Sequence, residues 1–208
     1  FATPRYWRFK DWDRTSVSAG GYTVLGDWAL LRFRGYYVNY YNVLDQYADS
    51  TVTTLQAEST YNNPIYGLFG IGEFTLASWN TLKASFYYED DKTRQQNNPG
   101  LPWVTYKQSM TSVGVEDHVS FFSDWQFIAG LSFDALDKYI GGTTTKVNPL
   151  VGIKYSPGDA LDIHVSFATK SKFPSMRELY SSTNGNPDLQ SEFGRSFEVS
   201  VTYNRGFL

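Results

Sequence analysis

Apolar and polar residues alternate with a period of two along most of the chain. From Leu161 to Phe167 the odd positions are apolar, and the even positions are Asp, His and Ser. The segment from Phe197 to Tyr203 repeats this arrangement, with Phe, Val and Tyr alternating with Glu, Ser and Thr. Because successive side chains of a β-strand point to opposite faces, the pattern predicts strands with one apolar and one polar face.

Turn-forming residues divide the chain by connections of two sizes. Short groups of Gly, Pro, Asp, Asn or Ser stand at 25–28, 78–80, 123–125 and 156–159, and longer segments stand at 45–51, 91–103, 139–143 and 171–190. Short and long connections alternate, as they do in membrane β-barrels, which have short periplasmic turns and long extracellular loops. We expect nine strands, at Thr15–Leu25, Trp28–Val43, Val52–Ala77, Thr81–Arg94, Val104–Phe121, Trp125–Tyr139, Thr143–Tyr155, Ala160–Lys170 and Glu192–Asn204. The long third strand is expected to bulge or kink at Asn62–Pro64.

Strand length and aromatic content separate a membrane barrel from a soluble β-sandwich or β-solenoid, which would also alternate. Several expected strands exceed 11 residues, whereas strands of globular proteins usually have 3–10. Aromatic residues make up 18% of the 208-residue chain. Trp28, Trp79, Trp125 and Tyr155 lie beside short turns, where aromatic girdles of membrane barrels are found. The sequence therefore predicts an all-β fold, an antiparallel transmembrane β-barrel segment.

Composition excludes several classes of function. The chain has no cysteine, which excludes thiolate metal sites and Cys nucleophiles. Its net charge is −3 and no basic stripe is present, so we expect no nucleic-acid partner. No spacing of ligand residues supports a metal site, and we expect no cofactor.

One segment carries a more specific signal. The sequence FATKSKFPSMRELYS begins at Phe167, and it is followed by NPDL from Asn186 and by Glu192. This segment resembles the late-barrel signature of TonB-dependent outer-membrane receptors, in which a strand runs into a Lys/Arg-Phe-Pro-Ser/Thr loop. The family commonly has a Pro just before the Glu, where this chain has Gln190 and Ser191.

Local physical chemistry accounts for the residues of this motif. Pro174 restricts the preceding residue to extended conformations and ends strand pairing. Ser175 and Glu178 have the spacing of a capping box, which predicts a single helical turn at Ser175–Tyr180. The Asn186-Pro187-Asp188 sequence favours a turn that returns the chain to the membrane.

The resemblance implies a part of a transporter. Barrels of this family have about 22 strands, so nine strands in 208 residues would be a partial barrel, residues 1–208, without the plug domain and the C-terminal strands. The implied function is active uptake of a metal chelate, of the ferric siderophore or cobalamin class, across the bacterial outer membrane, with energy delivered through TonB and with no enzymatic activity. The implied partners are outer-membrane lipid and lipopolysaccharide, the plug domain, TonB and the chelate. A passive, porin-like barrel is the alternative.

Candidate site residues fall into two groups. In loops, long polar or aromatic side chains are candidates for substrate contact, and the remaining alternative is that they are solvated loop residues. These are Arg94, Gln95, Gln96, Trp103, Arg177 and Tyr180. The polar positions Arg32, Arg34 and His164 are expected to line the lumen, because an outward charge at the bilayer midplane costs ~2–4 kcal/mol.

Two weaker hypotheses concern the histidines and an acidic run. His118 with Ser120, and His164 with Ser166, share a strand face at i, i+2, so a hydrolase pair is conceivable, although wall residues explain them as well. The run Glu89–Lys92 is interpreted as charges at the barrel rim, with lipopolysaccharide-bridging cations as a further possibility.

Overall fold

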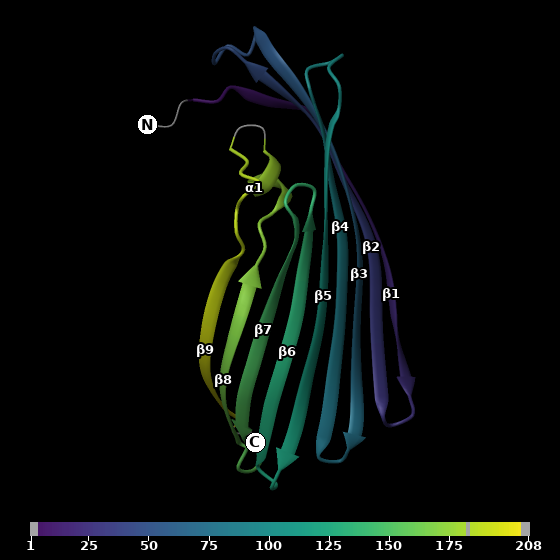
Figure 1. The fold of residues 1–208 in the computed structure, drawn as a ribbon, viewed down its shortest axis with the longest axis vertical. Helices are drawn as coiled ribbons and strands as arrows, with labels where there is room; N and C mark the ends of the chain where they lie inside the picture. Colours follow the sequence, from purple (N-terminus) through teal and green to yellow (C-terminus); the bar gives the residue numbers. More distant parts are fainter. Residues whose placement is uncertain (1–3, 182–183, 205–208) are drawn as a thin grey trace.

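A single antiparallel sheet makes up nearly all of the computed structural model, which describes residues 4–181 and 184–204 (Figure 1). Its strands pair in chain order from β1 to β9, and no ladder joins β1 to β9 among the described residues. The strands are β1 (Trp7–Leu25), β2 (Ala29–Tyr47), β3 (Leu55–Ala77), β4 (Asn80–Asn97), β5 (Val104–Phe121), β6 (Trp125–Lys138), β7 (Gly142–Tyr155), β8 (Leu161–Lys172) and β9 (Glu192–Tyr203). A short helix, α1 (Met176–Tyr180), lies between β8 and β9. The all-β antiparallel prediction is confirmed, and the open sheet is consistent with a partial barrel.

The strands differ from the prediction mainly at their loop ends. β1 begins at Trp7 instead of Thr15, because its backbone pairing with β2 continues to Trp7, with a register shift between Phe9 and Asp11. The predicted bulge at Asn62–Pro64 is wrong: no register shift occurs there. Pairing with β2 runs through these residues, and only the ladder to β4 skips Asn63 and Pro64.

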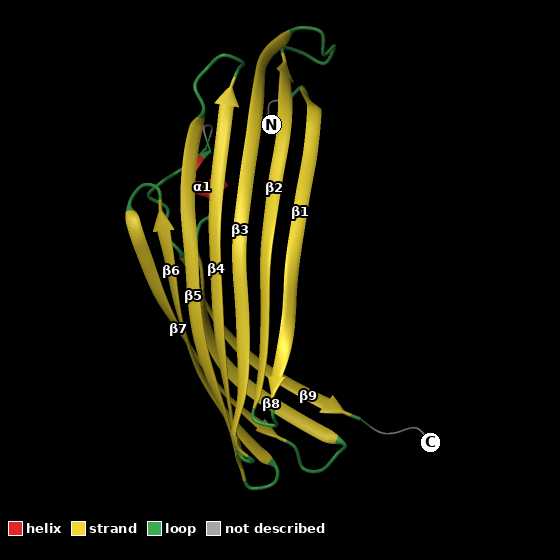
Figure 2. Ribbon diagram, turned by 90° about the vertical axis from the view of Figure 1, so that its right-hand side faces the viewer, coloured by secondary structure: helices red, strands yellow, loops and turns green. Residues whose placement is uncertain are grey.

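The registers divide the side chains into two continuous faces. Residues that lie directly opposite one another in successive strands share a face. The first face contains Phe33, Gly70, Phe86, Val113, Phe133 and Val147, and the second contains Arg34, Phe69, Tyr87, Ser112, Asp134 and Lys146. Helix α1 packs on Tyr106, which belongs to the second face, and Figure 2 shows α1 on the inner side of the curved sheet. The second face is therefore the inner one.

The outer face carries the apolar residues. Phe33, Leu131 and Phe197 are 59%, 55% and 71% exposed, which suits contact with lipid. Even positions of β5 to β9 share the inner face through their registers, so His164 and Glu198 lie on the inner face and their odd neighbours on the outer one.

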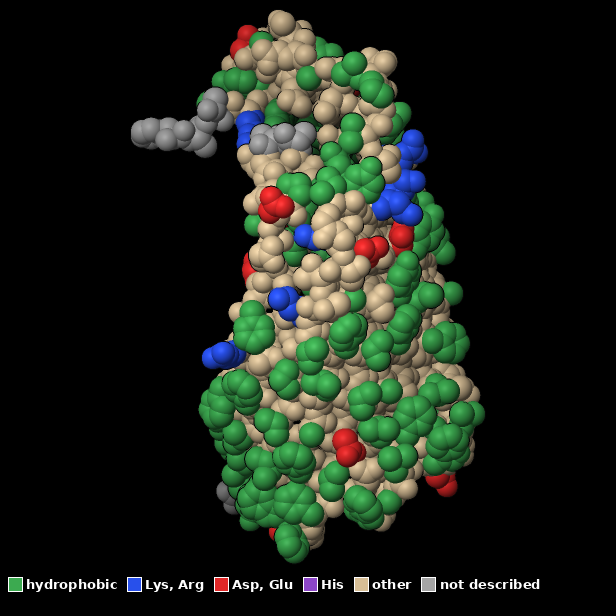
Figure 3. Space-filling model, viewed as in Figure 1, with side chains coloured by type: hydrophobic (Ala, Val, Ile, Leu, Met, Phe, Trp, Pro, Cys, Tyr) green, Lys and Arg blue, Asp and Glu red, His purple; other side chains and the backbone are tan. Residues whose placement is uncertain are grey.

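Aromatic rings border this apolar band. Trp28, Trp79, Trp125 and Tyr155 lie at the short-turn end, and Tyr37, Tyr66 and Tyr88 lie on the outer face further along the strands. From Trp79 to Tyr88 a strand rises roughly 30 Å, or roughly 23 Å across a membrane at a tilt of ~40°. That height matches the apolar band of outer-membrane barrels, about 25 Å. Figure 3 shows hydrophobic side chains gathered over this part of the molecule, with most Lys and Arg above them.

No helix in residues 4–181 or 184–204 is long and apolar enough to span a membrane.

Candidate functional site

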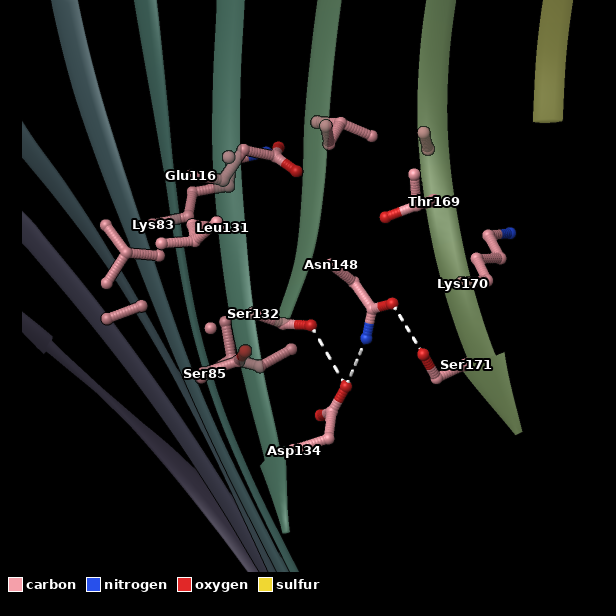
Figure 4. A pocket seen from close by; sticks show the side chains of 17 residues that line it. Lys83, Ser85, Glu116, Leu131, Ser132, Asp134, Asn148, Thr169, Lys170 and Ser171 are labelled. Atoms are coloured by element: carbon pink, nitrogen blue, oxygen red, sulfur yellow. Dashed lines mark hydrogen bonds between the residues drawn. The ribbon is translucent and has the colours of Figure 1, made fainter. Parts of the chain in front are cut away.

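The inner wall holds a cavity of about 490 Å³ that extends from β3 to β8 (Figure 4). Gly114 and Gly130, which lie opposite Ser132 and Leu150, both line this cavity. Charged and polar side chains from five strands surround that space. They include Lys83, Glu116, Asp134, Asn148, Lys170 and Ser171.

Asp134 is the centre of the hydrogen bonds in this cavity. Asn148 donates from Nδ2 to Asp134 Oδ2 at 2.6 Å, Ser132 donates to the same oxygen at 3.2 Å, and Ser112 donates to Oδ1. Ser171 in turn donates to Asn148 Oδ1 at 2.9 Å (Figure 4). The carboxylate is thus satisfied by three neutral donors from β5, β6 and β7, and the network mainly holds these strands together.

The cavity lies where two strands separate. β7 and β8 pair only from Leu150–Ala168 to Tyr155–Ile163, although both strands continue beyond Leu150 and Ala168. Pro149, which has no N–H to donate, is the first residue of β7 beyond the ladder. Above this point the bond between Ser171 and Asn148 connects the two strands.

The predicted wall residues lie on the inner face. Arg32 forms an ion pair with Glu73 across β2 and β3, at 3.2 Å, and Arg34 donates to Ser18 Oγ at 3.3 Å. The Arg32 side chain is 55% exposed, so this pair contributes little by itself. His164 lies on the same inner wall, with Nε2 close to Gly152.

An inner-face network further along β2 and β4 was not predicted from the sequence. Tyr36 and Tyr87 both donate to Glu89 Oε2, at 2.5 and 2.6 Å, and their hydroxyl oxygens are 3.0 Å apart. The Tyr36 ring lies directly over Gly67 of β3. A glycine opposite an inward tyrosine was the available signal, but only the register shows that the two residues meet.

The segment from 173 to 191 folds over the inner face, with residues 182 and 183 outside the described part. Ser175 caps α1 as predicted: it accepts from the Glu178 backbone, and Glu178 accepts from the Ser175 backbone N–H at 2.8 Å. These bonds from the Ser175 backbone and hydroxyl lower the pKa of the Glu178 carboxyl. The capping-box prediction is confirmed.

An aromatic cluster fixes this segment to β5 and β6. Tyr180 stacks on Tyr106 with ring centroids 4.7 Å apart, and Tyr139 meets both rings edge-on. The Tyr180 hydroxyl accepts from the Ile140 backbone N–H at 3.2 Å, and Lys138 Nζ donates to the Pro187 carbonyl at 3.3 Å. Tyr180 is consequently buried, whereas Arg177 is exposed.

The other loop candidates do not join this cluster. The expected loop at 91–103 is wrong in part, because β4 continues to Asn97 and places Arg94 and Gln96 on the outer face. The Arg94 guanidinium lies 5.0 Å from the Trp103 ring centroid, and Gln96 donates to the Leu101 carbonyl at 2.7 Å. Gln95 points inward and is buried. The substrate-contact candidates are therefore divided between opposite faces of the wall.

The hydrolase hypothesis finds no support in the geometry. The His118 ring bonds to Glu116 and Gln126, and no hydrogen bond joins Ser120 to His118 or Ser166 to His164 within the described residues. Nor do the described ranges contain three His, Cys, Asp or Glu side chains placed to hold a metal ion.

The chain is similar in sequence to one protein family and to one curated transporter. A family model described as TonB dependent receptor-like, beta-barrel matches residues 1–208. A vitamin B12 transporter, BtuB of Photobacterium profundum, is 26% identical over 116 residues, which is 50% of this chain and 18% of that protein.

Solved structures show the same fold. The copper transporter OprC superposes with a TM-score of 0.78 at 13% identity, over 96% of this chain and 37% of that one. The FrpB iron transporter from Neisseria meningitidis gives 0.71 at 15% identity, over 93% and 34%. The ferric citrate transporter FecA gives 0.64 at 13% identity, over 93% and 32%. The chain thus spans about a third of these structures and less of the B12 transporter.

Proposed function

Because the chain belongs to the TonB-dependent receptor β-barrel family, whose members are transporters and receptors and not enzymes, we propose that it is part of an active outer-membrane transporter for a metal chelate. The family match over residues 1–208 carries this proposal. The similar proteins are named as transporters of vitamin B12, copper, iron and ferric citrate. Their shared feature is a metal-containing cargo, so the proposed substrate class is a ferric siderophore, cobalamin or a comparable chelate.

The open sheet supports a larger barrel around a plug. β1 and β9 each have one edge without a partner strand in the described part of the chain. In a bilayer, each unpaired backbone group at such an edge costs several kcal/mol, about 4–8 on a water-to-cyclohexane basis. We therefore place the nine strands in a closed barrel of about 22, with the plug domain against the polar inner face and with TonB as the energy source. Outer-membrane lipid and lipopolysaccharide are the partners of the outer face.

The segment from 173 to 191, which we call the inward loop, is the best candidate for substrate contact in this chain. Arg177 is exposed beside the aromatic cluster, and Tyr180 holds the segment against β5. A guanidinium can bind anionic chelates, and tyrosine rings offer a rigid apolar surface. Arg94, Gln96 and Trp103 face outward, so the geometry does not favour them as substrate contacts.

The test is uptake by the full-length receptor in a host that lacks its own receptors. Labelled cobalamin, ferric citrate and copper are offered separately, with TonB present or deleted. We expect one of them to accumulate only when TonB is present. Accumulation of a substrate at the same rate without TonB would refute active transport and favour the passive, porin-like barrel.

Variants of this receptor test the loop. Arg177→Ala should reduce uptake of that substrate without lowering the amount of folded receptor, and Arg94→Ala on the outer face is the matched control. Equal effects of the two variants would show that the inward loop has no special role in substrate binding.

A further inference from the structure

The outer face carries a group of cations immediately beyond the apolar band. Outward positions of β4 read Leu82, Ala84, Phe86 and Tyr88 and then change to Asp90, Lys92 and Arg94. On β5, the corresponding outward residue is Lys107, directly opposite Lys92. We call Lys92, Arg94 and Lys107 the cationic patch. Figure 3 shows Lys and Arg side chains gathered above the hydrophobic area.

Nearby carboxylates neutralise the three cations of the patch only in part. Like charges directly opposite in an antiparallel pair repel, so Lys92 and Lys107 destabilise the β4–β5 ladder unless an anion lies between them. Lys107 has one ion pair, with Asp90 at a distance of 4.0 Å, and its side chain is 58% exposed. Within the described residues, neither Lys92 nor Arg94 forms an ion pair.

The position of the patch points to a lipid headgroup. Lys92 stands four residues beyond Tyr88, about 13 Å along the strand and roughly 10 Å further from the membrane centre at a tilt of ~40°. This is the level of the headgroups next to an apolar band. The Arg94–Trp103 contact supports that position, because tryptophan is enriched at membrane interfaces.

We propose that the cationic patch binds the phosphates of lipid A, the membrane anchor of lipopolysaccharide, in the outer leaflet. Guanidinium groups bind phosphate through paired hydrogen bonds, and lysines supply point charges. The long connections of the sheet lie on this side, and the family places them outside the cell, where lipopolysaccharide forms the leaflet. The inference rests on the proposed outer-membrane location, and it gives Arg94 a different role from substrate contact.

Lipid binding to the purified full-length receptor tests the proposal. Hexa-acylated diphosphoryl lipid A is titrated into receptor in detergent, with EDTA present so that no divalent cation bridges phosphates to carboxylates, and bound lipid is counted by native mass spectrometry. Removing one lysine near a membrane surface should weaken binding about fivefold, so K92Q/K107Q should weaken it about 25-fold. Asp90→Asn should strengthen binding, because it removes the acid beside Lys107.

The matched control is Lys83→Gln, which removes a cation from the inner face of the same strand. It should leave the affinity unchanged, and lipid A that lacks phosphates should bind wild type and K92Q/K107Q equally weakly. Equal affinity of wild type and K92Q/K107Q for diphosphoryl lipid A, or the same loss in Lys83→Gln, would refute the patch. This assay involves no uptake, so its failure is distinct from a failure of the transport proposal.

Discussion

Replacing Gly67 by alanine should test whether the inner-face network of β2, β3 and β4 is as tight as the structure shows. A Cβ on Gly67 would lie 2.1 Å from Tyr36 Cζ and 2.4 Å from its hydroxyl oxygen. These distances are far below van der Waals contact, so the tyrosine ring has to leave its position. It cannot do so without breaking its bonds to Glu89 and Tyr87.

The expected cost follows from these bonds. A hydrogen bond to a charged group contributes about 1.5–3 kcal/mol, and the bond from Tyr36 to Glu89 is of this kind. Alanine also restricts the unfolded chain more than glycine does, which stabilises the folded state by about 0.4–1 kcal/mol. The first effect is larger, so Gly67→Ala should destabilise by about 1–2 kcal/mol.

The measurement is urea unfolding of the full-length receptor in detergent, followed by tryptophan fluorescence. Gly70→Ala is the matched control, because its Cβ would meet only a backbone oxygen at 3.8 Å, an ordinary contact. It should be neutral or slightly stabilising. In a Tyr36→Ala background, Gly67→Ala should lose most of its effect, as expected for residues in contact. If Gly67→Ala and Gly70→Ala unfold at the same urea concentration, the packing described for Tyr36 is incorrect.

Three further predictions concern the loop and the outer face. The lowered pKa of Glu178 means that its capping interaction is present above the unfolded carboxyl pKa of about 4.3 and is lost as pH falls through the lower, folded value. Hydrogen exchange of α1, corrected for intrinsic rates, should therefore accelerate below about pH 4. The Glu178→Gln variant should abolish this pH dependence. Asp117 faces outward within the apolar band and accepts from Asn80 at 2.6 Å. Asp117→Asn should therefore stabilise the barrel by up to about 1–2 kcal/mol in urea unfolding, because charges facing lipid are costly, and a destabilised variant would contradict this. Tyr180→Phe keeps the ring stack but removes the bond to the Ile140 N–H, so exchange of that one amide should accelerate while α1 remains protected.

The sequence predicted the order of the strands and their two faces, but not where all of the strands end. Alternation between Leu161 and Phe167 identified the apolar, outer side of β8. The registers link the even positions from β5 to β9 on the opposite face, so the same assignment holds for these strands. The pattern failed at the loop ends, where β1 and β4 continue beyond the apolar band and pair through backbone bonds that need no apolar pattern. Arg94 was expected in a loop for this reason.

The candidate site was only partly predictable. The capping box at Ser175 depends on neighbours three residues apart, so the sequence contained all the information needed. The stack of Tyr180 on Tyr106 and the hydrogen bonds of Asp134 join residues from different strands and loops. Such contacts depend on the register and on how the β8–β9 segment folds inward, and a single sequence specifies neither.

Labelling of single cysteines in intact cells tests the central claim most directly, which is that the sheet crosses an outer membrane with its long connections outside. Cysteine replaces Asn184 in the β8–β9 loop in one variant and Asp159 in the β7–β8 turn in another. Asp159 is chosen over its neighbour Gly158, whose φ of +84° disfavours any other residue. A membrane-impermeant maleimide should label the cysteine at 184 in intact cells, and it should label the one at 159 only after the outer membrane is opened. Labelling of 159 but not 184 in intact cells would contradict the topology, and equal labelling of both would contradict the membrane-spanning sheet.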